Sequence, residues 1–551
     1  MNTPSSAWLA PAVQPLLIRD LLTRVRTWAP NQKIIYRDVR ELTYAEFFLR
    51  VERLAHVLTH FGVRPGTRVG VLDWDSHRYL ELFFAVPMLG AVLHTVNVRL
   101  APEQMAYTIR HAEDSVVLVH PDFLQIAEAL APHLPHVQTW ISLTDDGQLP
   151  VSALVLAGDY ETLLAAAPGG FVFPELDENT VATLFYTTGT TGDPKGVFFT
   201  HRQIVLHTLT GGFTFAAHEV PLSLGDHDVY LPLTPMFHVQ AWGFPYIATL
   251  LGLKQVYPGR FEPGAVLQLL ARHAVTVSHC VPTVLQMLLH HPDNAKVNWS
   301  HLKLVIGGAP LPQGLAQQAL DRGVRIVGAY GMSETCPLVA VAHVKAALDG
   351  TETATGTTDL DVITRTGFPM PLVSAGIMNP EGDLLPLGRE NTGELVLRAP
   401  WLTAGYHLEP ERTAELWRGG WLHTGDIAYR DEDGYLRITD RLKDVIKIGG
   451  EWISSLELEN ALSQHEAVKE VAVVGRPDPK WDERPHADIV LREGFAGRVT
   501  PRDLQKFLHR FTDSGAIHKR AILTQVRFVE SIPRTSVGKF DKKRLRASLA
   551  G

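Results

Sequence analysis

Short β-rich segments alternate with helical patterns over most of the chain, and this alternation is the sequence feature that most restricts the fold. TRVGVLDW (67–74) and HLKLVIGG (301–308) are apolar runs that end in turns, which is typical of buried strands. MAYTIRHAED (105–114) and GLAQQALDRG (314–323) have the apolar spacing that favours helices. Strands that alternate with helices form mostly parallel sheets with helices on both faces. We therefore predict a large α/β domain.

The pattern changes at about residue 366, where short strands and turns replace the alternation. The tetrapeptide DEDG (431–434) between two alternating runs is typical of a β-hairpin. After Asp440 come a strand, a Gly-Gly turn, an amphipathic helix and another strand, which predict a small α+β domain. Charged residues around Asp440 interrupt two strand-like runs, so we expect domains at residues 1–439 and 440–551.

Composition indicates an ordinary globular protein of 551 residues, too long for one core. The net charge of −8 argues against a chain dedicated to nucleic acid. The only two cysteines, Cys280 and Cys336, are far apart, so we expect no disulfide or zinc framework and a reducing compartment. No secretory signal and no apolar run of membrane-spanning length is evident, which predicts a cytoplasmic location.

Positive charge is concentrated at the C-terminal end, where residues 501–551 hold twelve Lys or Arg against four Asp or Glu. A solvated surface explains this concentration equally well as a lid that carries positive charge toward a polyanionic ligand.

Residues 187–196, TTGTTGDPKG, hold three glycines, four threonines and one lysine directly after the apolar run VATLFY. Backbone N–H groups, hydroxyls and one cation in such density predict a phosphate-binding loop, although polar β-turns share this composition. A Walker A loop is excluded, because Pro194 occupies the second glycine position counted from Gly189 and Gly196 follows Lys195. The candidate phosphate ligands are Thr187, Thr188, Gly189, Thr190, Thr191, Gly192 and Lys195.

Three further motifs carry groups that suit a nucleotide. YGMSET (330–335) offers an aromatic face, a turn glycine and a carboxylate suited to Mg²⁺, although Glu334 could instead cap a helix. WLHTGDIA places Asp426 after a turn, where a carboxylate can accept hydrogen bonds from ribose hydroxyls, or where Gly-Asp is simply a turn. PRTSVGKF presents Lys539 on a loop, where a lysine alone is most often a solvated charge.

Together, YTTGTTGDPKG, YGMSET, TGD, DRLKDVIKIGGEWIS and PRTSVGKF, in this order and spacing, resemble the adenylate-forming superfamily of acyl-CoA synthetases, luciferases and peptide-synthetase adenylation domains. PMFHVQAW and KIGGEWISSLELENAL resemble its medium- to long-chain fatty acyl-CoA synthetase branch. The resemblance covers roughly residues 30–548. It implies a large domain of parallel sheets with a small β-barrel-like subdomain, followed by a small mobile C-terminal domain. It also implies that a fatty acid and ATP form an acyl-adenylate and pyrophosphate, and that CoA then displaces AMP.

The resemblance also assigns roles to residues. The loop from Thr187 to Lys195 would hold the β- and γ-phosphates of ATP, and Thr187 with Glu334 would hold Mg²⁺. Asp426, aided by Arg441, would bind the ribose. The remaining nucleotide candidates are Tyr330, with Gly331 and Ser333 beside it, which would stack on adenine, and Gly308, Ala309 and Pro310 on its other face.

Two residues are the catalytic candidates. Lys539 is implied to reach the α-phosphate and the acyl carboxylate. His238 lies where the family places an aromatic or histidine side chain beside these groups, although a hydrogen-bonded core histidine is the alternative. Rotation of the C-terminal domain about Asp440 would exchange the Lys539 loop for the face that carries Lys443, Lys447 and Trp452. These three residues would contact the nucleotide or the other domain. The alternative is that the two lysines only keep an exposed strand edge charged, which prevents aggregation.

Val239 and Trp242 are the candidates for contact with the acyl group, within an apolar run that includes Phe244 and Tyr246. The resemblance implies that Trp242 is a gate for a fatty-acid tunnel; the alternative is that Trp242 only packs in the hydrophobic core.

Alternatives for the function are a ligase that loads a carrier protein, an aryl-acid ligase, a luciferase-type oxidation or a non-catalytic nucleotide sensor. Long-chain relatives also suggest a homodimer.

Overall fold

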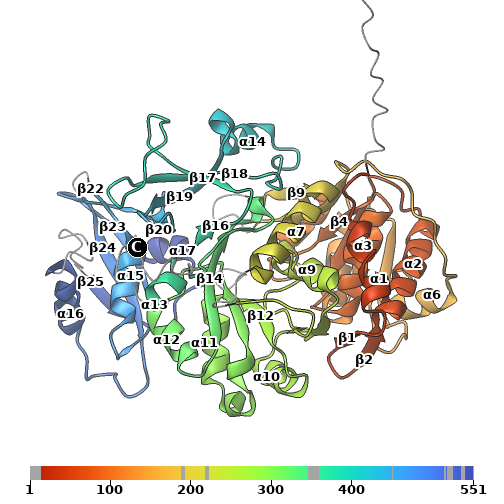
Figure 1. Ribbon diagram of the computed structural model, residues 1–551, viewed down its shortest axis with the longest axis horizontal. Coiled ribbons are helices and arrows are strands. Elements are labelled where there is room, and N and C mark those ends of the chain that lie inside the picture. The colour runs from red at the N-terminus through yellow and green to blue at the C-terminus, as the bar shows by residue number, and fades with distance from the viewer. Residues whose placement is uncertain are drawn as a thin grey trace, which may run out of the picture.

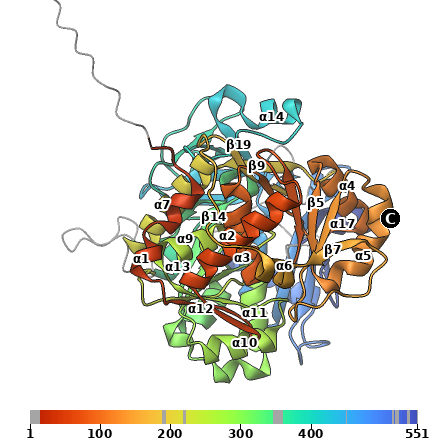
Figure 2. The ribbon, with the colours of Figure 1, turned by 90° about the vertical axis from the view of Figure 1, so that its right-hand side faces the viewer.

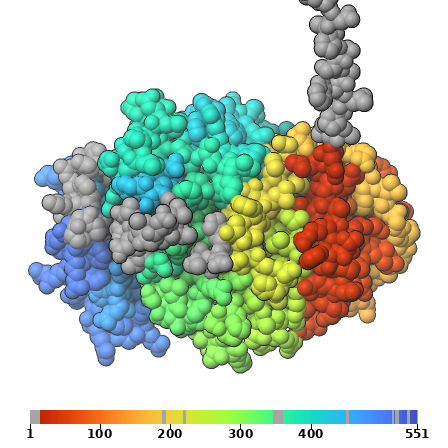
Figure 3. Space-filling model, viewed as in Figure 1, coloured from red at the N-terminus to blue at the C-terminus, as the bar shows by residue number. Residues whose placement is uncertain are grey.

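The computed structural model describes residues 14–187, 193–217, 222–344, 359–448, 451–513, 517, 525–534 and 540–549, without the side chains of 451 and 452. Elements near the N-terminus lie at one end of the molecule and those after residue 440 at the other (Figures 1 and 3). Among the described residues, no helix is both long and apolar enough to pass through a bilayer.

The expected parallel sheets are present, and two of them form the larger part of the chain. One has seven strands in the order β7-β6-β5-β3-β4-β8-β9, parallel except for the β8–β9 pair. Figure 2 shows β5 and β7 of this sheet near α4 (Pro102–Ala112) and α5 (Leu124–Leu130). The strands are β3 Arg68–Leu72, β4 Val92–Thr95, β5 Val116–Val119, β6 Thr139–Ser142, β7 Leu156–Asp159, β8 Val181–Tyr186 and β9 Gly196–Thr200.

The second sheet has nine strands in the order β16-β15-β14-β13-β12-β10-β11-β1-β2, parallel from β14 to β1 and antiparallel at both ends. Its strands are β1 Lys33–Tyr36, β2 Arg40–Thr43, β10 Val229–Tyr230, β11 Lys254–Tyr257, β12 Val277–Cys280, β13 Lys303–Ile306, β14 Arg325–Gly331, β15 Leu338–Val341 and β16 Phe368–Pro369.

Helices that cover these sheets begin where the sequence offers caps. Thr43 accepts a hydrogen bond from the amide of Glu46 at the start of α2, and Thr200 does the same for Gln203 at the start of α7. The apolar run 82–93, which is too short to span a membrane, is buried in α3, in β4 and between them. The helices of this part are α1 Val25–Trp28, α2 Tyr44–His60, α3 His77–Met88, α6 Tyr160–Ala166, α7 His201–Ala216, α9 Phe244–Leu251, α10 Pro263–Arg272, α11 Pro282–His290, α12 Gln313–Leu320 and α13 Asp359–Ile363.

A four-stranded antiparallel sheet follows, in the order β17-β18-β19-β20, and corresponds to the small β-rich subdomain that the sequence predicts. DEDG forms the turn between β19 and β20, as predicted. β20 continues through Asp440 to Arg441, so the predicted domain boundary falls inside a strand and not at a break between strands. The elements are β17 Ser374–Met378, β18 Gly393–Arg398, α14 Pro410–Leu416, β19 Leu422–Arg430 and β20 Leu436–Arg441.

The C-terminal part has its own core. The hydrophobic clusters formed by residues 446–549 share no member with those formed by residues 16–438. The expected strand, helix and strand after Asp440 are β21 with β22, α15 and β23. The elements are β21 Ile446–Ile448, β22 Glu451–Ile453, α15 Ser455–Ser463, β23 Val468–Asp478, β24 Asp482–Leu491, α16 Pro501–Asp513, β25 Gln525–Phe528 and α17 Lys542–Leu549.

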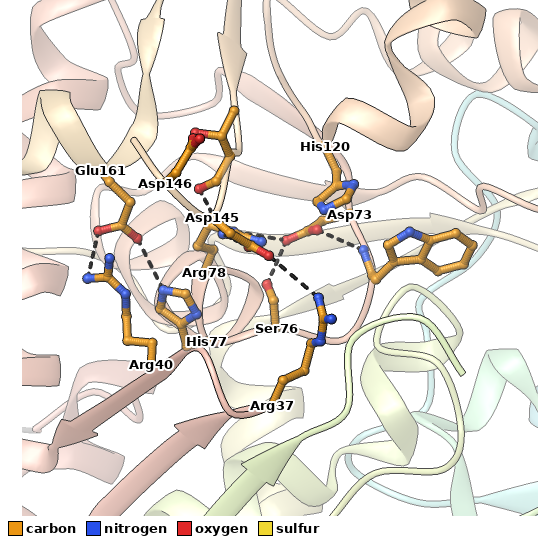
Figure 4. A network of polar contacts seen from close by, with 12 residues as sticks. Arg37, Arg40, Asp73, Ser76, His77, Arg78, His120, Asp145, Asp146 and Glu161 are labelled. Carbon is orange, nitrogen blue, oxygen red and sulfur yellow. Dashed lines mark hydrogen bonds and ion pairs between the residues drawn. The ribbon is translucent and has the colours of Figure 1, made fainter. Parts of the chain in front are cut away.

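A network of buried and partly exposed charged side chains joins α3 to both parallel sheets (Figure 4). The carboxylate of Asp145 lies between Arg78, at 2.9 Å, and Arg37, at 3.5 Å. The carboxylate of Glu161 on α6 lies 3.0 Å from Arg40 on β2 and 3.1 Å from His77. Because these partners come from different sheets, the network fixes how the sheets sit relative to each other.

We expect Glu161→Gln to lower the free energy of unfolding by about 2 kcal/mol, because Arg40 loses this carboxylate and Arg50 keeps only Glu81 as its partner. Burial raises the pKa of Glu161, but hydrogen bonds from His77 and Arg50 outweigh it and hold the pKa below its ordinary value. The stabilisation is therefore present above roughly pH 4.3 and is lost as the pH falls below that value.

Urea denaturation of the variant across this pH range measures the effect. Glu175→Gln is the matched control, because Glu175 also pairs with an arginine, at 2.8 Å, but is 84% exposed. Equal losses in the two variants would contradict a structural role for the network.

Candidate active site

Several predicted nucleotide-binding residues lie at the carboxyl ends of neighbouring parallel strands. Gly308 follows β13, and Tyr330 with Gly331 ends β14. Ala309 and Pro310 are exposed on the loop after β13. A side chain at position 331 would overlap the carbonyl oxygen of Pro337, which explains the glycine. Ligands of open α/β sheets bind at this edge.

Asp426 holds the centre of this region. Its Oδ2 accepts a hydrogen bond of 2.6 Å from the Tyr330 hydroxyl, and its Oδ1 lies 2.6 Å from Nε of Arg441. Asp426 and Arg441 are cross-strand partners on β19 and β20, which brings the two predicted ribose-binding residues together. Burial and the negative charge of Asp426 raise the pKa of Tyr330 well above its ordinary value, and Asp426 also raises the pKa of Arg441. The carboxylate, 2% exposed, therefore sits between two permanent donors.

The predicted phosphate loop connects β8 to β9 at the edge of the seven-stranded sheet. The amide of Thr187 donates to the carbonyl of Lys195 at 2.9 Å, which closes the base of the loop. Lys195 is half-buried, and its Nζ lies 4.5 Å from the centroid of the Tyr406 ring. The other predicted ligands, Thr188, Gly189, Thr190, Thr191 and Gly192, lie outside the described residues.

Glu334 lies with Ser333 in the 3-10 turn Ser333–Thr335 after β14, so the turn and not a longer helix positions its carboxylate. Its side chain accepts a hydrogen bond of 2.6 Å from the Tyr406 hydroxyl, and its residue is 7% exposed. Sequence analysis missed Tyr406, because a tyrosine beside a loop glycine carries no signal until its partner, far away in sequence, is known.

Residues 403–407, named here the clamp segment, connect Glu334 to the strand after the phosphate loop. The amide of Thr403 donates to the carbonyl of Glu334 at 3.0 Å, and its Oγ1 donates to the carbonyl of Phe198 at 2.8 Å. The amide of His407 donates to the carbonyl of Gly196 at 2.8 Å. The clamp segment thus fixes the distance between two predicted phosphate-handling regions.

The predicted acyl-contacting residues form a left-handed turn, α8 (Val239–Trp242). Their φ angles are 45°, 52°, 49° and 59°, and Gly243 continues the turn with 74°. Left-handed conformations are unfavourable for residues with a Cβ, and most of all for β-branched valine, so the surroundings must hold the turn. The half-buried His238 directly precedes it.

Contacts to the residues that precede the turn supply part of this support. The carboxylate of Asp75 accepts a 2.6 Å hydrogen bond from the amide of Met236, and Thr95 donates to the carbonyl of Phe237 at 3.1 Å. Burial raises the pKa of Asp75 to about 7. Asp75 is a second residue that the sequence analysis missed.

Trp242 connects the turn to the predicted adenine loop. The indole packs against Gly307, where an added Cβ would lie 3.1 Å from it, and its centroid is 5.1 Å from that of His279. Gly307 directly precedes Gly308. The ring of one acyl candidate therefore contacts the residue next to a nucleotide candidate.

Asp440, the predicted hinge residue, is 1% exposed and bound to the C-terminal part. Its Oδ2 accepts a 2.5 Å hydrogen bond from the amide of Ser455 at the start of α15. Lys542 on α17 lies 2.7 Å from the Ser455 hydroxyl and 2.7 Å from Glu459. Burial raises the pKa of Asp440, and the positive charge of Lys542 opposes that rise. Lys542 thus stabilises the carboxylate that the sequence analysis placed at the pivot.

The remaining predicted residues lie near this junction. Lys443 and Lys447 are exposed, and the amide of Lys447 donates to Glu483 at 2.8 Å. Lys539 and the side chain of Trp452 lie outside the described residues, so their roles stay predictions.

Comparison with known proteins gives two family matches. The profile of the AMP-binding enzyme family matches residues 23–407, and the profile of the AMP-binding enzyme C-terminal domain matches residues 457–539.

Relatives extend over nearly the whole chain. A long-chain-fatty-acid–CoA ligase of Thermus thermophilus is 40% identical, with 97% of this chain and 95% of the relative covered. A 3-methylmercaptopropionyl-CoA ligase of Ruegeria pomeroyi is 37% identical, with 97% of each covered. The crystal structure of ATP-bound MatB from Rhodopseudomonas palustris is 26% identical, with a TM-score of 0.81 over 97% of this chain and 98% of that one.

We expect Lys542→Met to free the start of α15, because Asp440 and Glu459 then lose the buried cation between them. Hydrogen–deuterium exchange of the Ser455 amide should become about tenfold faster. Lys543→Met is the matched control, since Lys543 is the next residue on α17 and is exposed. Unchanged exchange at Ser455 in Lys542→Met would show that this ammonium does not hold the hinge carboxylate.

Proposed function

The chain belongs to the AMP-binding enzyme family as an AMP-forming acid–thiol ligase, and we propose that its acid substrate is a medium- to long-chain fatty acid. The observation that carries this proposal is the apolar turn beside the adenine loop. Val239, Trp242 and Phe244 are at most 4% exposed, and Trp242 contacts the residue before Gly308. The identity with the long-chain-fatty-acid–CoA ligase supports the same substrate class.

The reaction requires positive charge that is in place before the substrates meet. In the first step a carboxylate oxygen attacks the α-phosphorus of ATP, and the bond to pyrophosphate breaks. In the second step the thiol of CoA attacks the acyl carbon and AMP leaves. Both reactants of the first step are anions, so Lys195 near the terminal phosphates and Lys539 near the α-phosphate would lower the barrier.

The nucleotide would be held by its ribose and its base. The Asp426 carboxylate has lone pairs beyond those engaged by Tyr330 and Arg441, and these lone pairs can accept hydrogen bonds from the ribose hydroxyls. The hydroxyl bond also fixes the Tyr330 ring, which would face adenine opposite Gly308, Ala309 and Pro310. His238, at the start of the left-handed turn, would lie beside the reacting carboxylate.

The residues near the phosphate loop suit magnesium. The carboxylate of Glu334 and the hydroxyl of Thr187 are the hard oxygen donors that this ion prefers. Bound there, Mg²⁺ would neutralise phosphate charge and orient pyrophosphate as the leaving group. In this proposal Glu334 and Thr187 are the protein residues that hold the ion.

We propose that the C-terminal part rotates about Asp440 between the two steps, which replaces Lys539 at the site by the face with Lys443, Lys447 and Trp452. Two units, at residues 1–439 and 440–551, agree with the separate hydrophobic clusters. A cytoplasmic location and a homodimer stay predictions.

A series of saturated fatty acids from two to eighteen carbons tests the substrate class, with AMP release measured with and without CoA. Each further buried CH₂ contributes about 0.8 kcal/mol, so kcat/KM should rise up to about fourfold per carbon until the apolar compartment is filled. Two further acids complete the panel. Ferulate represents the aryl-acid alternative, and 3-methylmercaptopropionate is the acid in the name of the Ruegeria relative. A preference for either over every fatty acid would overturn the fatty-acid proposal.

Lys539→Ala separates the two steps. Adenylate formation, measured as fatty-acid-dependent ATP–pyrophosphate exchange, should fall by about two to three orders of magnitude, because a donor to the developing charge is lost. Thioester formation from a supplied acyl-adenylate should stay within about twofold of the wild type. Lys543→Ala removes another lysine of the same basic region and should change neither step. Equal loss in both steps would contradict the assigned role.

A further inference from the structure

Tyr406 lies between two side chains of opposite charge that the proposed reaction needs. Its hydroxyl donates a 2.6 Å hydrogen bond to Oε1 of Glu334, and the Nζ of Lys195 lies 4.5 Å from the centroid of its ring. Tyr406 itself is 8% exposed. Both charges contact Tyr406, yet Lys195 and Glu334, which are both among the described residues, form no ion pair with each other.

An ammonium and a carboxylate that contact the same side chain attract each other, most strongly where water is partly excluded. An ion pair would occupy the lysine that should meet the phosphates and the carboxylate that should meet the metal. The face of an aromatic ring attracts a cation without neutralising its charge. A hydroxyl donor likewise orients a carboxylate and leaves its charge in place.

The backbone around Tyr406 holds the ring in this position. Tyr406 forms an isolated antiparallel bridge with Val197, two residues after Lys195, and its amide donates to Oγ1 of Thr413 at 2.9 Å. The neighbouring His407 and Thr403 bond to Gly196 and to the backbone of Glu334. The clamp segment therefore carries the ring between the two regions that hold the charges.

We propose that Tyr406 is a positioning residue that keeps Lys195 and Glu334 apart, so that Lys195 is available to the terminal phosphates of ATP and Glu334 to magnesium. The inference rests on the proposed function, since it assigns these two ligands. The ring and the hydroxyl have different tasks: the ring separates the charges, and the hydroxyl orients Glu334. Two substitutions distinguish these tasks.

Tyr406→Phe keeps the ring and removes the hydroxyl. Binding of ATP in EDTA, measured by calorimetry, should stay within about twofold of the wild type, because Lys195 keeps its aromatic neighbour. The gain in ATP affinity on adding Mg²⁺ should shrink about tenfold, because Glu334 loses the donor that fixes its orientation. An unchanged magnesium-dependent gain would overturn the task assigned to the hydroxyl.

Tyr406→Leu removes the ring as well, so that Lys195 and Glu334 can pair. ATP binding in EDTA should then weaken by about tenfold, since a paired lysine attracts phosphate less. Adding Glu334→Gln removes the carboxylate that captures Lys195. The double variant should therefore bind metal-free ATP as Glu334→Gln alone does. Failure of Glu334→Gln to restore this binding would overturn the proposed separation of charges.

Tyr435 provides matched controls, because it also donates a 2.6 Å hydrogen bond, to the carbonyl of His343, and has an arginine, Arg365, 4.9 Å from its ring centroid. Tyr435→Phe and Tyr435→Leu should leave ATP binding unchanged in both conditions. Equal effects in the control and test variants would point to general destabilisation and would contradict the inference.

If the wild type shows no acid-dependent ATP–pyrophosphate exchange, the proposed function fails. If the wild type shows this exchange but Tyr406→Leu binds metal-free ATP as tightly as the wild type, only this inference fails.

Discussion

The carboxylate of Asp426 connects the small antiparallel sheet to the nine-stranded sheet. Its two partners come from different elements, Tyr330 from the nine-stranded parallel sheet and Arg441 from the end of the small antiparallel sheet. A carboxylate so buried is stable only with such donors, because an unpaired charge would be expelled or protonated. The hydrogen bond from Tyr330 to the predicted ribose ligand is therefore one of the contacts that join the small sheet to the nine-stranded sheet, beside the bridge between Gly367 and Leu436. In the proposed function, nucleotide binding and this contact between the sheets would depend on the same group.

The charges of the molecule follow two different designs. In the N-terminal network each cation is satisfied by a carboxylate, as Arg78 is by Asp145 and Arg40 by Glu161 (Figure 4). Such pairs stabilise the fold and leave no charge for a ligand. Near the phosphate loop, Lys195 faces an aromatic ring and Glu334 a hydroxyl. Neutral partners preserve the charges, which is what a site for a highly charged substrate requires.

The sequence was sufficient to predict the parallel sheets, the hairpin at DEDG and the family to which the chain belongs. These features have local signals: alternation of strand and helix patterns, turn residues, and motifs of known spacing. The support of the site was not predictable in this way. Tyr406 acquires its meaning from Glu334, and Asp75 from the amide of Met236, across long sequence separations. The left-handed turn at Val239 opposes the preference of its own residues, so only tertiary contacts could reveal it.

The position of Asp440 inside β20 restricts how any rotation there can occur. The ladder between β19 and β20 continues beyond Asp440, because Arg441 pairs with Asp426 and the amide of Leu442 donates to the carbonyl of Gly425 at 2.9 Å. A rotation about the backbone of Asp440 therefore has to break these contacts, including the guanidinium contact to Asp426. A nucleotide that binds through Asp426 stabilises or weakens that same contact. The proposed rotation of the C-terminal part and the occupancy of the proposed ribose site would consequently be coupled through Arg441, without any longer pathway.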